Sequence, residues 1–455
     1  MTIEYKTEIS EKQRSPMEAF QEITEAIAEH EGYRDRCLNL IASENSMSPA
    51  TKKALASDLG NRYTVCNANG ERLFPGSEKY NSIEEHAVRL INKLLPVPEG
   101  GFVTVQPVSG MNANEVAYHT LINRGDLVLS VRGCHGGHYS HEQGVNRFTS
   151  DENGHGNVSY GKATRLLDLF GAVVDYLPFY DVSYQLNTKA AIEMINQRKP
   201  KLLIVGASEM LFPIPLKELR PVCNHTGTKI LYDAAHVAGL ILGGKFQQPL
   251  LEGADLVTAS TNKTMGGPDH GFVASSQEII PGSQNTYKQM IRQGLKPMFT
   301  SNHHAHHVAG VAVTLTELDQ WGKEYATQVI NNAKALGKRL YELGIKVVAS
   351  NYGFTESHTI LVDLNKPAQD TVDNLACANI ILNTTELPGD QPGQERGLRI
   401  GTNEMTRKGM NEPEMEIIAE LIATVIKHPE LASTVKDKVK QLRAKFQEQR
   451  YCFSV

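Results

Sequence analysis

The chain has 455 residues, which is too long for a single ordinary hydrophobic core, so two domains are expected. Its 46 basic and 51 acidic residues give a net charge of −5, and no basic block favours nucleic acid or a membrane surface as a partner. The polar first residues lack the apolar core of a signal peptide, and no apolar run approaches the roughly 18 residues that span a bilayer. Six scattered cysteines without a Cys-x-x-Cys pair indicate a reduced protein, so a cytoplasmic location is expected.

Helical and strand patterns alternate along the chain. Apolar residues at helical spacing predict an N-terminal helix over 15–32 and a second helix over 83–95. Seven short apolar runs with helical stretches between them predict strands over 102–106, 127–131, 172–176, 202–206, 229–232, 255–259 and 272–275. Beyond them, the pattern predicts a long helix, three strands and two closing helices over 308–342, 345–348, 358–364, 397–401, 413–427 and 429–449. This alternation is typical of an α/β fold with a mostly parallel sheet.

Asp233 and Lys263 are the most informative residues of the chain. Asp233 ends an apolar run at 229–232, and Lys263 lies among small hydroxyl residues after a second run at 254–258. Two parallel strands deliver such groups to one edge of a sheet, where the sites of α/β proteins form. Pyridoxal phosphate needs this pair, because a lysine amine forms a Schiff base with its aldehyde and a carboxylate keeps a proton on its pyridine nitrogen. Either residue alone is more often a turn residue or a solvated charge, so the prediction depends on both.

Two further turns follow predicted strands. Ser109-Gly110-Met111 opens a helix after the strand at 102–106, and a small, glycine-containing turn at a helix start offers free N–H groups to a phosphate. His135 and His138 stand in the segment Cys134-His135-Gly136-Gly137-His138, after another strand. A histidine between small residues can stack on a flat ring, bind a metal ion or simply belong to a loop, and the residues alone leave these interpretations open.

Taken in order, these segments resemble the serine hydroxymethyltransferase family from about residue 15 to about residue 430. The blocks that carry the resemblance are Leu40-Ile41-Ala42-Ser43-Glu44-Asn45, Val105-Gln106-Pro107-Val108-Ser109-Gly110, His135-Gly136-Gly137-His138, Asp233-Ala234-Ala235-His236-Val237-Ala238-Gly239-Leu240, Asn262-Lys263-Thr264-Met265-Gly266-Gly267-Pro268 and Gly397-Leu398-Arg399-Ile400-Gly401-Thr402. The resemblance implies the aspartate-aminotransferase-like fold (fold type I), with a mostly parallel seven-stranded sheet in a large domain and a smaller C-terminal α/β domain. The expected division is an N-terminal helical arm at 1–35, a large domain at 36–305 and a small domain at 306–455. It also implies pyridoxal 5'-phosphate as cofactor and a homodimer or tetramer whose active sites are built from two subunits.

Carried over position by position, the resemblance gives each residue a role. Lys263 would form the Schiff base, Asp233 would pair with the pyridinium nitrogen, and His135 would stack on the ring. The remaining cofactor contacts would come from Ser109, Gly110, Met111, Ser208, His236, Ser260, Ser301 and Asn302. Arg399 would clamp the amino-acid carboxylate bidentately, and the substrate pocket would include Ser43, Tyr63 and Arg72. The β-hydroxyl proton would pass to Tyr63, Glu44, His135 or His138.

The chain departs from the family's pattern around Tyr63, a position that reaches the partner's site. The pattern there reads Tyr-x-Glu-Gly-Tyr-Pro-Gly-x-Arg-Tyr-Tyr-Gly-Gly, whereas here Val65 replaces the glutamate, and Leu73 and Phe74 replace the two tyrosines near substrate and folate. Valine carries no proton, and neither of the other replacements offers a hydroxyl. This favours a folate-independent member, similar to the threonine transaldolases, with a neutral and apolar pocket that suits an uncharged aldehyde.

Three other features qualify the match. Asn262 replaces the histidine that usually precedes the lysine, and Asp269 replaces an arginine after Gly-Pro. Four histidines cluster at 303–307, and His303 and His307 are one helical turn apart. A metal site is one interpretation of that spacing, but histidines at a helix start more often contact phosphate or solvent, so no metal is expected.

The expected activity is making or breaking the Cα–Cβ bond of β-hydroxy-α-amino acids, as an L-threonine transaldolase or aldolase, with small amino acids and aldehydes as substrates. One alternative is a tetrahydrofolate-dependent serine (or α-methylserine) hydroxymethyltransferase that uses Glu71 or a water molecule. The non-enzyme alternative is a structural subunit without cofactor. The intact Lys263, Asp233 and Arg399 argue against that third interpretation.

Overall fold

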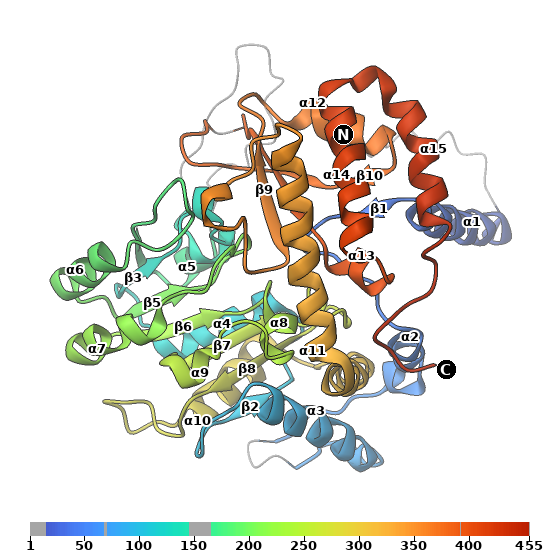
Figure 1. Cartoon of the computed structure of the whole chain (residues 1–455). Coiled ribbons are helices and arrows are strands. Elements are labelled where there is room, and N and C mark those ends of the chain that lie inside the picture. Colours follow the sequence, from blue (N-terminus) through green and yellow to red (C-terminus); the bar gives the residue numbers. More distant parts are fainter. Residues whose placement is uncertain (1–14, 68–70, 145–164, 392, 455) are drawn as a thin grey trace.

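A seven-stranded sheet is the framework of the molecule (Figure 1). In the computed structural model, which describes residues 15–67, 71–144, 165–391 and 393–454, the strand order is β2-β8-β7-β6-β5-β3-β4. The strands are Val103–Thr104 (β2), Leu127–Ser130 (β3), Val173–Tyr176 (β4), Leu202–Val205 (β5), Lys229–Asp233 (β6), Leu256–Ser260 (β7) and Gly271–Ser275 (β8). Strands β3 to β7 run parallel, and β8 is antiparallel to both β7 and β2. All seven predicted strands are present, and the mostly parallel sheet is confirmed.

Both faces of this sheet are buried, as in parallel sheets that lie between helices. Successive residues of a strand point to opposite faces, so Leu203 and Val205 of β5 enter one apolar core while Leu202 and Ile204 enter another. The helices around the sheet are α3 (Asn81–Leu94), α4 (Gly110–Leu121), α5 (Leu166–Leu169), α6 (Thr188–Arg198), α7 (Leu216–Thr226), α8 (Ala238–Leu242), α9 (Pro249–Glu252) and α10 (Tyr287–Gln293). The interior of the sheet is therefore apolar, and the polar residues of the site lie where its strands end.

One long helix joins the seven-stranded sheet to the C-terminal part of the chain. The first half of α11 (Ala305–Glu342), from Val308 to Val329, packs into a core beside that sheet. Its last turns, from Ala333 to Leu340, pack into a separate C-terminal core. Strands of an antiparallel sheet in the order β11-β12-β9 and four helices build that second core: β9 (Thr359–Asp363), β11 (Asn383–Thr385), β12 (Gly397–Gly401), α12 (Gln369–Cys377), α13 (Asn403–Arg407), α14 (Glu412–Lys427) and α15 (Ala432–Arg443).

The segment after α1 packs with the C-terminal core rather than with the large sheet. Strand β1 (Leu38–Asn39) pairs in parallel with β10 (Ile380–Ile381), and Leu38 and Leu40 are fully buried there. The backbone N–H of Gly401 donates to the Leu40 carbonyl oxygen at 2.8 Å, so this segment runs beside β12. The predicted boundary at residue 36 thus differs from the packing, because strand pairing ties residues 38–40 to the C-terminal part.

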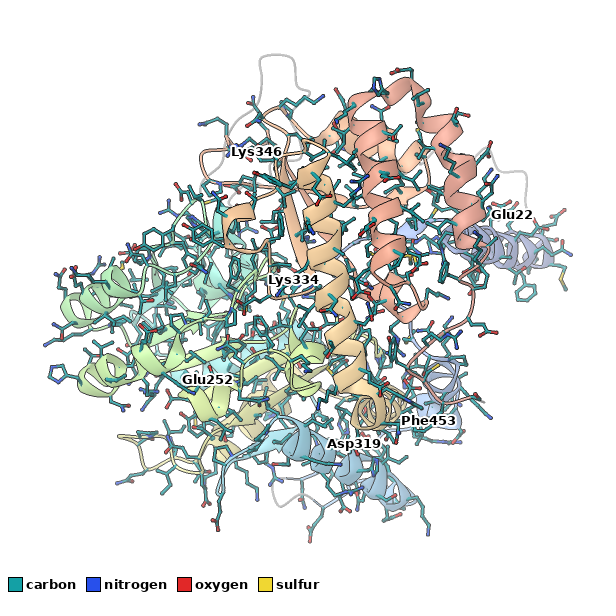
Figure 2. The ribbon with its side chains drawn as sticks, in the orientation of Figure 1. Glu22, Glu252, Asp319, Lys334, Lys346 and Phe453 are labelled. Atoms are coloured by element: carbon teal, nitrogen blue, oxygen red, sulfur yellow. The ribbon has the colours of Figure 1, made fainter. Side chains whose placement is uncertain are left out.

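Helix α1 (Pro16–Asp35) projects from the body of the molecule, as Figures 1 and 2 show around the labelled Glu22. It confirms the helix predicted over 15–32, and it precedes the short α2 (Pro49–Leu55). None of its residues is buried, and four of its apolar side chains are each more than half exposed: Met17, Phe20, Ile23 and Ile27. Residues 1–14 of the predicted arm lie outside the described residues.

Two elements near the C-terminus differ from their predicted form. The strand predicted over 345–348 is reduced to one bridge, between Val347 and Val362, because only this point of the segment pairs with β9. The helix predicted over 429–449 begins as a 3-10 turn and ends with α15 at Arg443. Among the described helices, none has the length and apolar composition needed to span a membrane.

Candidate active site

A cavity of about 460 Å³ lies where the parallel strands end. Strand β6 ends at Asp233 and β7 ends at Ser260, and the loops that follow carry His236 and Lys263 into the cavity. Asp233 pairs with Thr258 in the sheet, so the two strand ends are neighbours. Many of the predicted site residues line this cavity: Ser43, Ser109, Gly110, Met111, His138, Ser208, Asp233, His236, Ser260, Lys263 and Arg399.

Asp233 is a buried carboxylate at the floor of the cavity. Its Oδ2 accepts hydrogen bonds from His141 Nε2 and Asn114 Nδ2, both at 2.9 Å, and its Oδ1 accepts from the Ala235 N–H at 2.8 Å. Burial alone would raise the pKa of Asp233, but the hydrogen bond and charge of His141, with help from Asn114, hold that pKa below its ordinary value. Asp233 therefore keeps its negative charge in an apolar setting.

His141 and Asn114 were not predicted as site residues. Asn114 lies within the helix-opening segment after Ser109, and His141 follows His138 by three residues, so both lay close to motifs that the sequence offered. No spacing rule links either of them to Asp233, because Asn114 lies in α4 and His141 in a 3-10 turn, both far in sequence from the end of β6. Their roles become visible only when the fold brings β6 next to α4.

The backbone beside Asp233 also depends on a glycine. Gly206, directly after β5, has φ of +115°, and a Cβ there would lie 2.1 Å from the carbonyl oxygen of Asp233. Only glycine combines that backbone conformation with so close an approach. The end of β5 therefore packs directly against the end of β6, and this contact helps to fix the position of Asp233 in the cavity.

The Lys263 side chain is enclosed in the same cavity. Burial lowers the pKa of its amine, and the negative charge of Asp233 opposes that effect. Asn45 Nδ2 donates to the carbonyl oxygen of Lys263 at 2.8 Å, which anchors the loop. A lowered pKa increases the share of the neutral amine, and the neutral amine is the form that attacks an aldehyde.

The start of α4 presents backbone N–H groups to the cavity. Ser109 caps this helix, since its Oγ accepts from the Asn112 N–H at 3.0 Å, and Gly110 and Met111 begin the helix. A Cβ on Gly110 would lie 2.8 Å from the Cβ of Ser260, so the absence of a side chain lets α4 approach β7. A helix N-terminus of this kind attracts phosphate.

The two histidines of the His135–His138 turn are separated by the structure. His138 lines the cavity, and burial lowers its pKa to about 3, so the ring is neutral near pH 7. His135 points elsewhere: its Nε2 bonds to Asp181 at 2.8 Å, and its ring stacks on Phe179 at 5.4 Å. The structure does not support the predicted stacking of His135 on the cofactor ring, because Asp181 and Phe179 hold its ring elsewhere, and of the two histidines only His138 lines the cavity.

Arg399 is hydrogen-bonded through its Nε, and its two terminal nitrogens have no partner among the described residues. It lies opposite Asn383 in the β11–β12 ladder, and its Nε donates to Asn383 Oδ1 at 3.3 Å. Behind it lies Glu209, a buried side chain that accepts a hydrogen bond from Thr385 Oγ1. Burial raises the pKa of Glu209, with the charge of Arg399 acting the other way. No other hydrogen bond or ion pair engages Arg399 in the described parts of the chain, so its outer nitrogens face the cavity.

The other predicted residues lie outside this cavity. Glu44 is paired with Arg34, Tyr63 is 55% exposed, and Asn302 lies in the loop before α11. Arg72 forms an ion pair with Glu84 at 2.5 Å, which holds it in a second cavity that Ser301 also lines. Within one chain, ion pairs hold Glu44 and Arg72 outside the pocket of Lys263, so their expected place in that pocket stays a prediction for a site built from two subunits.

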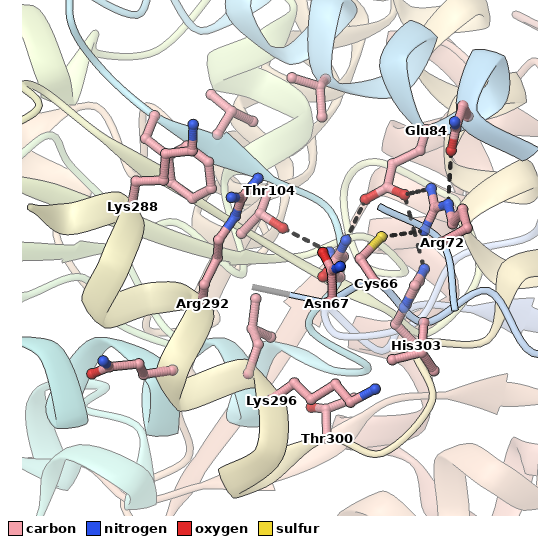
Figure 3. Close-up of a pocket in the computed structure, with 18 of the residues that line it drawn as sticks. Cys66, Asn67, Arg72, Glu84, Thr104, Lys288, Arg292, Lys296, Thr300 and His303 are labelled. Atoms are coloured by element: carbon pink, nitrogen blue, oxygen red, sulfur yellow. Dashed lines mark hydrogen bonds and ion pairs between the residues drawn. The ribbon is translucent and has the colours of Figure 1, made fainter. Parts of the chain in front are cut away.

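The second cavity has a volume of about 1110 Å³ and lies between α3, α10 and the segment around Val65 and Leu73. Figure 3 shows basic side chains on one side of it and the Arg72–Glu84 pair on the other. Its charged lining residues are Arg72, Arg89, Lys288, Arg292, Lys296, Glu84 and Glu85. This differs from the predicted neutral, apolar pocket, because α10 and the turn after it bring cations to face the two replaced positions.

The histidine cluster does not converge on one point. His303 is buried, with its Nε2 3.1 Å from Thr64 Oγ1, whereas His307 Nδ1 is 3.0 Å from the carbonyl oxygen of Asp269. Within the residues that the structure describes, no three histidine, cysteine or acidic side chains are arranged to hold a metal ion.

The cofactor cavity fits pyridoxal phosphate on its own geometry. A nucleophilic amine, a carboxylate whose pKa is held low and a helix N-terminus face one space of suitable size, and the buried His236 Nδ1 has no hydrogen-bond partner within the chain's described part. Pyridoxal phosphate needs a covalent anchor, a counter-charge for its ring nitrogen and a site for its phosphate, and the cavity offers all three.

Comparison with known proteins gives consistent results. The family model for serine hydroxymethyltransferase matches residues 17–422. Serine hydroxymethyltransferase from Methanopyrus kandleri is 38% identical over 442 residues, covering 96% of each chain, and that from Korarchaeum cryptofilum is 39% identical, covering 96% of this chain and 98% of its own. The crystal structure of L-threonine transaldolase from Pseudomonas fluorescens in its internal aldimine state superposes with a TM-score of 0.81 at 26% identity, over 96% of this chain and 94% of that one.

Lys263→Ala should remove the covalent attachment of the cofactor and all turnover, because the cavity holds no second lysine among the described residues. Borohydride reduction followed by mass spectrometry measures the attachment, and Lys189→Ala on the surface of α6 is the matched control. A reducible adduct that persists in Lys263→Ala would show that another amine is the anchor.

His141→Phe should leave the cofactor attached and slow turnover by roughly 10- to 100-fold, since a hydrogen bond to a charged group is worth about 1.5–3 kcal/mol. Without that bond, burial raises the pKa of Asp233, so the rate of the variant should rise with pH over a range where the wild type is flat. The same change at the exposed His428 serves as control. A wild-type pH profile in His141→Phe would rule out this role.

Proposed function

The chain belongs to the serine hydroxymethyltransferase family of pyridoxal-phosphate-dependent enzymes, and from its site we propose that it makes or breaks the Cα–Cβ bond of β-hydroxy-α-amino acids. The observation that carries this proposal is the convergence of Lys263, Asp233 and Arg399 on one cavity. These are the groups that would anchor the cofactor, hold its ring protonated and bind the substrate carboxylate.

Each residue of the candidate site has a defined role in this proposal. Pyridoxal phosphate, when bound, supplies an electron-accepting ring that weakens a bond at Cα. Lys263 holds the cofactor covalently, Asp233 holds the proton on the pyridine nitrogen, and the N-terminus of α4 holds the phosphate. His138 lines the cavity and would lie against the bound ring, and burial lowers its pKa to about 3, so its imidazole is neutral near pH 7. Ser208, His236 and Ser260 complete the walls.

Substrate orientation follows from Arg399. Its free nitrogens bind the amino-acid carboxylate as a planar fork, and the fixed carboxylate then determines which bond at Cα lies toward the ring. Of the candidates for taking the β-hydroxyl proton, His138 alone lines the cavity of its own chain. Tyr63 and Glu44 would take part only from a partner subunit.

We favour a folate-independent reaction, with L-threonine as donor and an aldehyde as acceptor. Val65, Leu73 and Phe74 offer neither an acid nor a hydroxyl at the positions where the family's pattern has both. The similarity to an L-threonine transaldolase structure supports this choice. The names of the archaeal relatives favour the alternative, a tetrahydrofolate-dependent serine (or α-methylserine) hydroxymethyltransferase.

We further propose that two copies of the chain associate, as a homodimer or within a tetramer. The apolar face of α1 and the apolar group formed by Tyr63, Leu73 and Phe74 are both exposed, and each is the kind of surface that a subunit interface covers. Ser301 and Asn302 would then reach the partner's phosphate, and Arg72 would line the shared site. All six cysteines are free thiols, which fits the proposed cytoplasmic location.

Arg399→Ala should raise the KM for L-threonine by about 30- to 700-fold while cofactor binding changes little, because truncating a charge-assisted contact costs about 2–4 kcal/mol. Arg399→Lys keeps the charge but loses the fork, so it should recover only part of the affinity. If cofactor is lost while the substrate constant stays unchanged, Arg399 binds something else.

Tetrahydrofolate should have no effect on the release of acetaldehyde from L-threonine, and L-serine should be a poor formaldehyde donor to it. Val65→Glu should not confer good folate use, since both tyrosines are also missing. Steady-state rates with and without tetrahydrofolate measure this directly. Fast conversion of serine to glycine that strictly requires the folate would establish the alternative reaction.

A further inference from the structure

We propose that the second cavity binds the anionic group of the acceptor, so that the acceptor is an aldehyde carrying a carboxylate or a phosphate. This inference rests on the proposed aldehyde-transferring function. It reverses the expectation of an uncharged acceptor that the replacements at Val65 and Leu73 alone suggest.

One wall of the cavity is a row of cations. Lys288, Arg292 and Lys296 follow one another at four-residue intervals along α10 and the turn after it, and all three line the cavity. Figure 3 shows Lys288 and Arg292 on one side of the space and Lys296 at its base, near Thr300. The two lysine ammonium groups form no hydrogen bond or ion pair with the described residues, so their charge is available to a ligand.

The acidic groups of the opposite wall do not cancel this charge. Glu84 is bound by Arg72 at 2.5 Å and by Gln106 Nε2 at 2.6 Å, and His303 lies 3.9 Å from it. Glu85 lines the cavity together with the oppositely charged Arg89, four residues later on the same helix, and Arg89 Nη2 lies 2.7 Å from His86 Nδ1. Because the whole chain carries a net charge of −5, a surplus of cations here is a local feature and not a reflection of composition.

Two hydrogen bonds link the cavity to the cofactor site, although no described residue lines both. Thr300 lines it and donates through Oγ1 to Asn112 Oδ1 at 3.0 Å, and the N–H of Asn112 in turn donates to the cap oxygen of Ser109. Val65 and Leu73, which stand where the family's pattern places contacts to the one-carbon carrier, line the same space. In the proposal, the anionic end of the acceptor binds here and its aldehyde end extends toward the cofactor cavity.

The size and the apolar part of the cavity define the rest of the ligand. Its volume of about 1110 Å³ far exceeds what acetaldehyde requires, and Val88, Phe102 and Leu295 offer apolar contacts to a carbon skeleton. The reaction balances without a further reagent. The Cα–Cβ bond of threonine breaks and acetaldehyde leaves; Cα then bonds to the acceptor's carbonyl carbon, whose oxygen takes up a proton.

The test compares aldehydes that differ in charge, namely succinic semialdehyde with butanal and glyceraldehyde 3-phosphate with glyceraldehyde. With the holoenzyme and L-threonine, kcat/KM for the charged member of at least one pair should exceed that of its neutral counterpart by about tenfold or more. The preference should fall with rising salt, since exposed charges are screened. If the succinic semialdehyde pair shows the preference, the ligand group is a carboxylate, and if the glyceraldehyde pair shows it, the group is a phosphate.

Variants tie the preference to the cavity. Lys288→Gln and Lys296→Gln should each reduce the ratio, and Lys288→Glu combined with Lys296→Glu should abolish or invert it. Lys189→Glu on α6, outside the cavity, should leave the ratio as in the wild type. A neutral preference in the wild type, or a ratio that the double variant does not change, overturns the proposal.

A binding measurement separates this proposal from the proposed function. Calorimetry of the holoenzyme with succinate and with inorganic phosphate requires no turnover. Binding that Lys288→Glu/Lys296→Glu eliminates, in a protein that does not cleave threonine, would mean that the reaction is misassigned while the anion site stands. Threonine cleavage without binding of either anion would refute the anion site alone.

Discussion

The hydrogen bond between His141 and Asp233 is the interaction on which the site depends. A carboxyl group in an apolar interior tends to take up a proton, and the ring chemistry of pyridoxal phosphate requires that Asp233 does not. His141 and Asn114 solve this conflict from within the fold, each at 2.9 Å from the same oxygen. They come from opposite ends of a segment that spans α4 and β3, so the sheet must be assembled before the charge is stable.

The site also depends on the way in which the two hydrophobic cores pack together, as the position of Arg399 shows. Lys263 and Asp233 belong to loops of the seven-stranded sheet, whereas Arg399 stands on β12 of the antiparallel sheet. The β1–β10 pair and the bond from Gly401 to Leu40 carry Ser43 to the same point from the N-terminal side. The candidate substrate position is therefore defined by three separate lengths of chain, and none of them folds around it alone.

Sequence reasoning reached most of the architecture because strands buried on both faces read as continuous apolar runs, and all seven were found in that way. It failed at 345–348, where Val347 has the apolar character of a strand but pairs with β9 at a single bridge. The hydrophobic pattern cannot show how many residues of β9 are free to pair with this segment. It also identified Lys263 and Asp233, whose residue types are specific to the cofactor.

The remaining errors concern where side chains point. His135 and His138 have the same neighbours in sequence, and only Asp181 and Phe179, more than forty residues away, decide which of the two lines the cavity. Arg72 is held by Glu84 within one chain, and its expected place near Lys263 stays a prediction for a two-subunit site. The charge of the second cavity was missed because Val65 and Leu73 are apolar, whereas Lys288, Arg292 and Lys296, over 200 residues later, line the same space.

The length of α11 has a mechanical consequence. At about 1.5 Å per residue, its 38 residues form a rod of nearly 60 Å that is embedded in both cores. A rod fixed at both ends transmits bending as a change of angle, so a small flexure near Val329 would swing the antiparallel sheet against the parallel one. The gap between Arg399 and Lys263 would open or narrow with that swing, so the stiffness of one helix would influence the distance between the residue proposed to bind the substrate and the residue that anchors the cofactor.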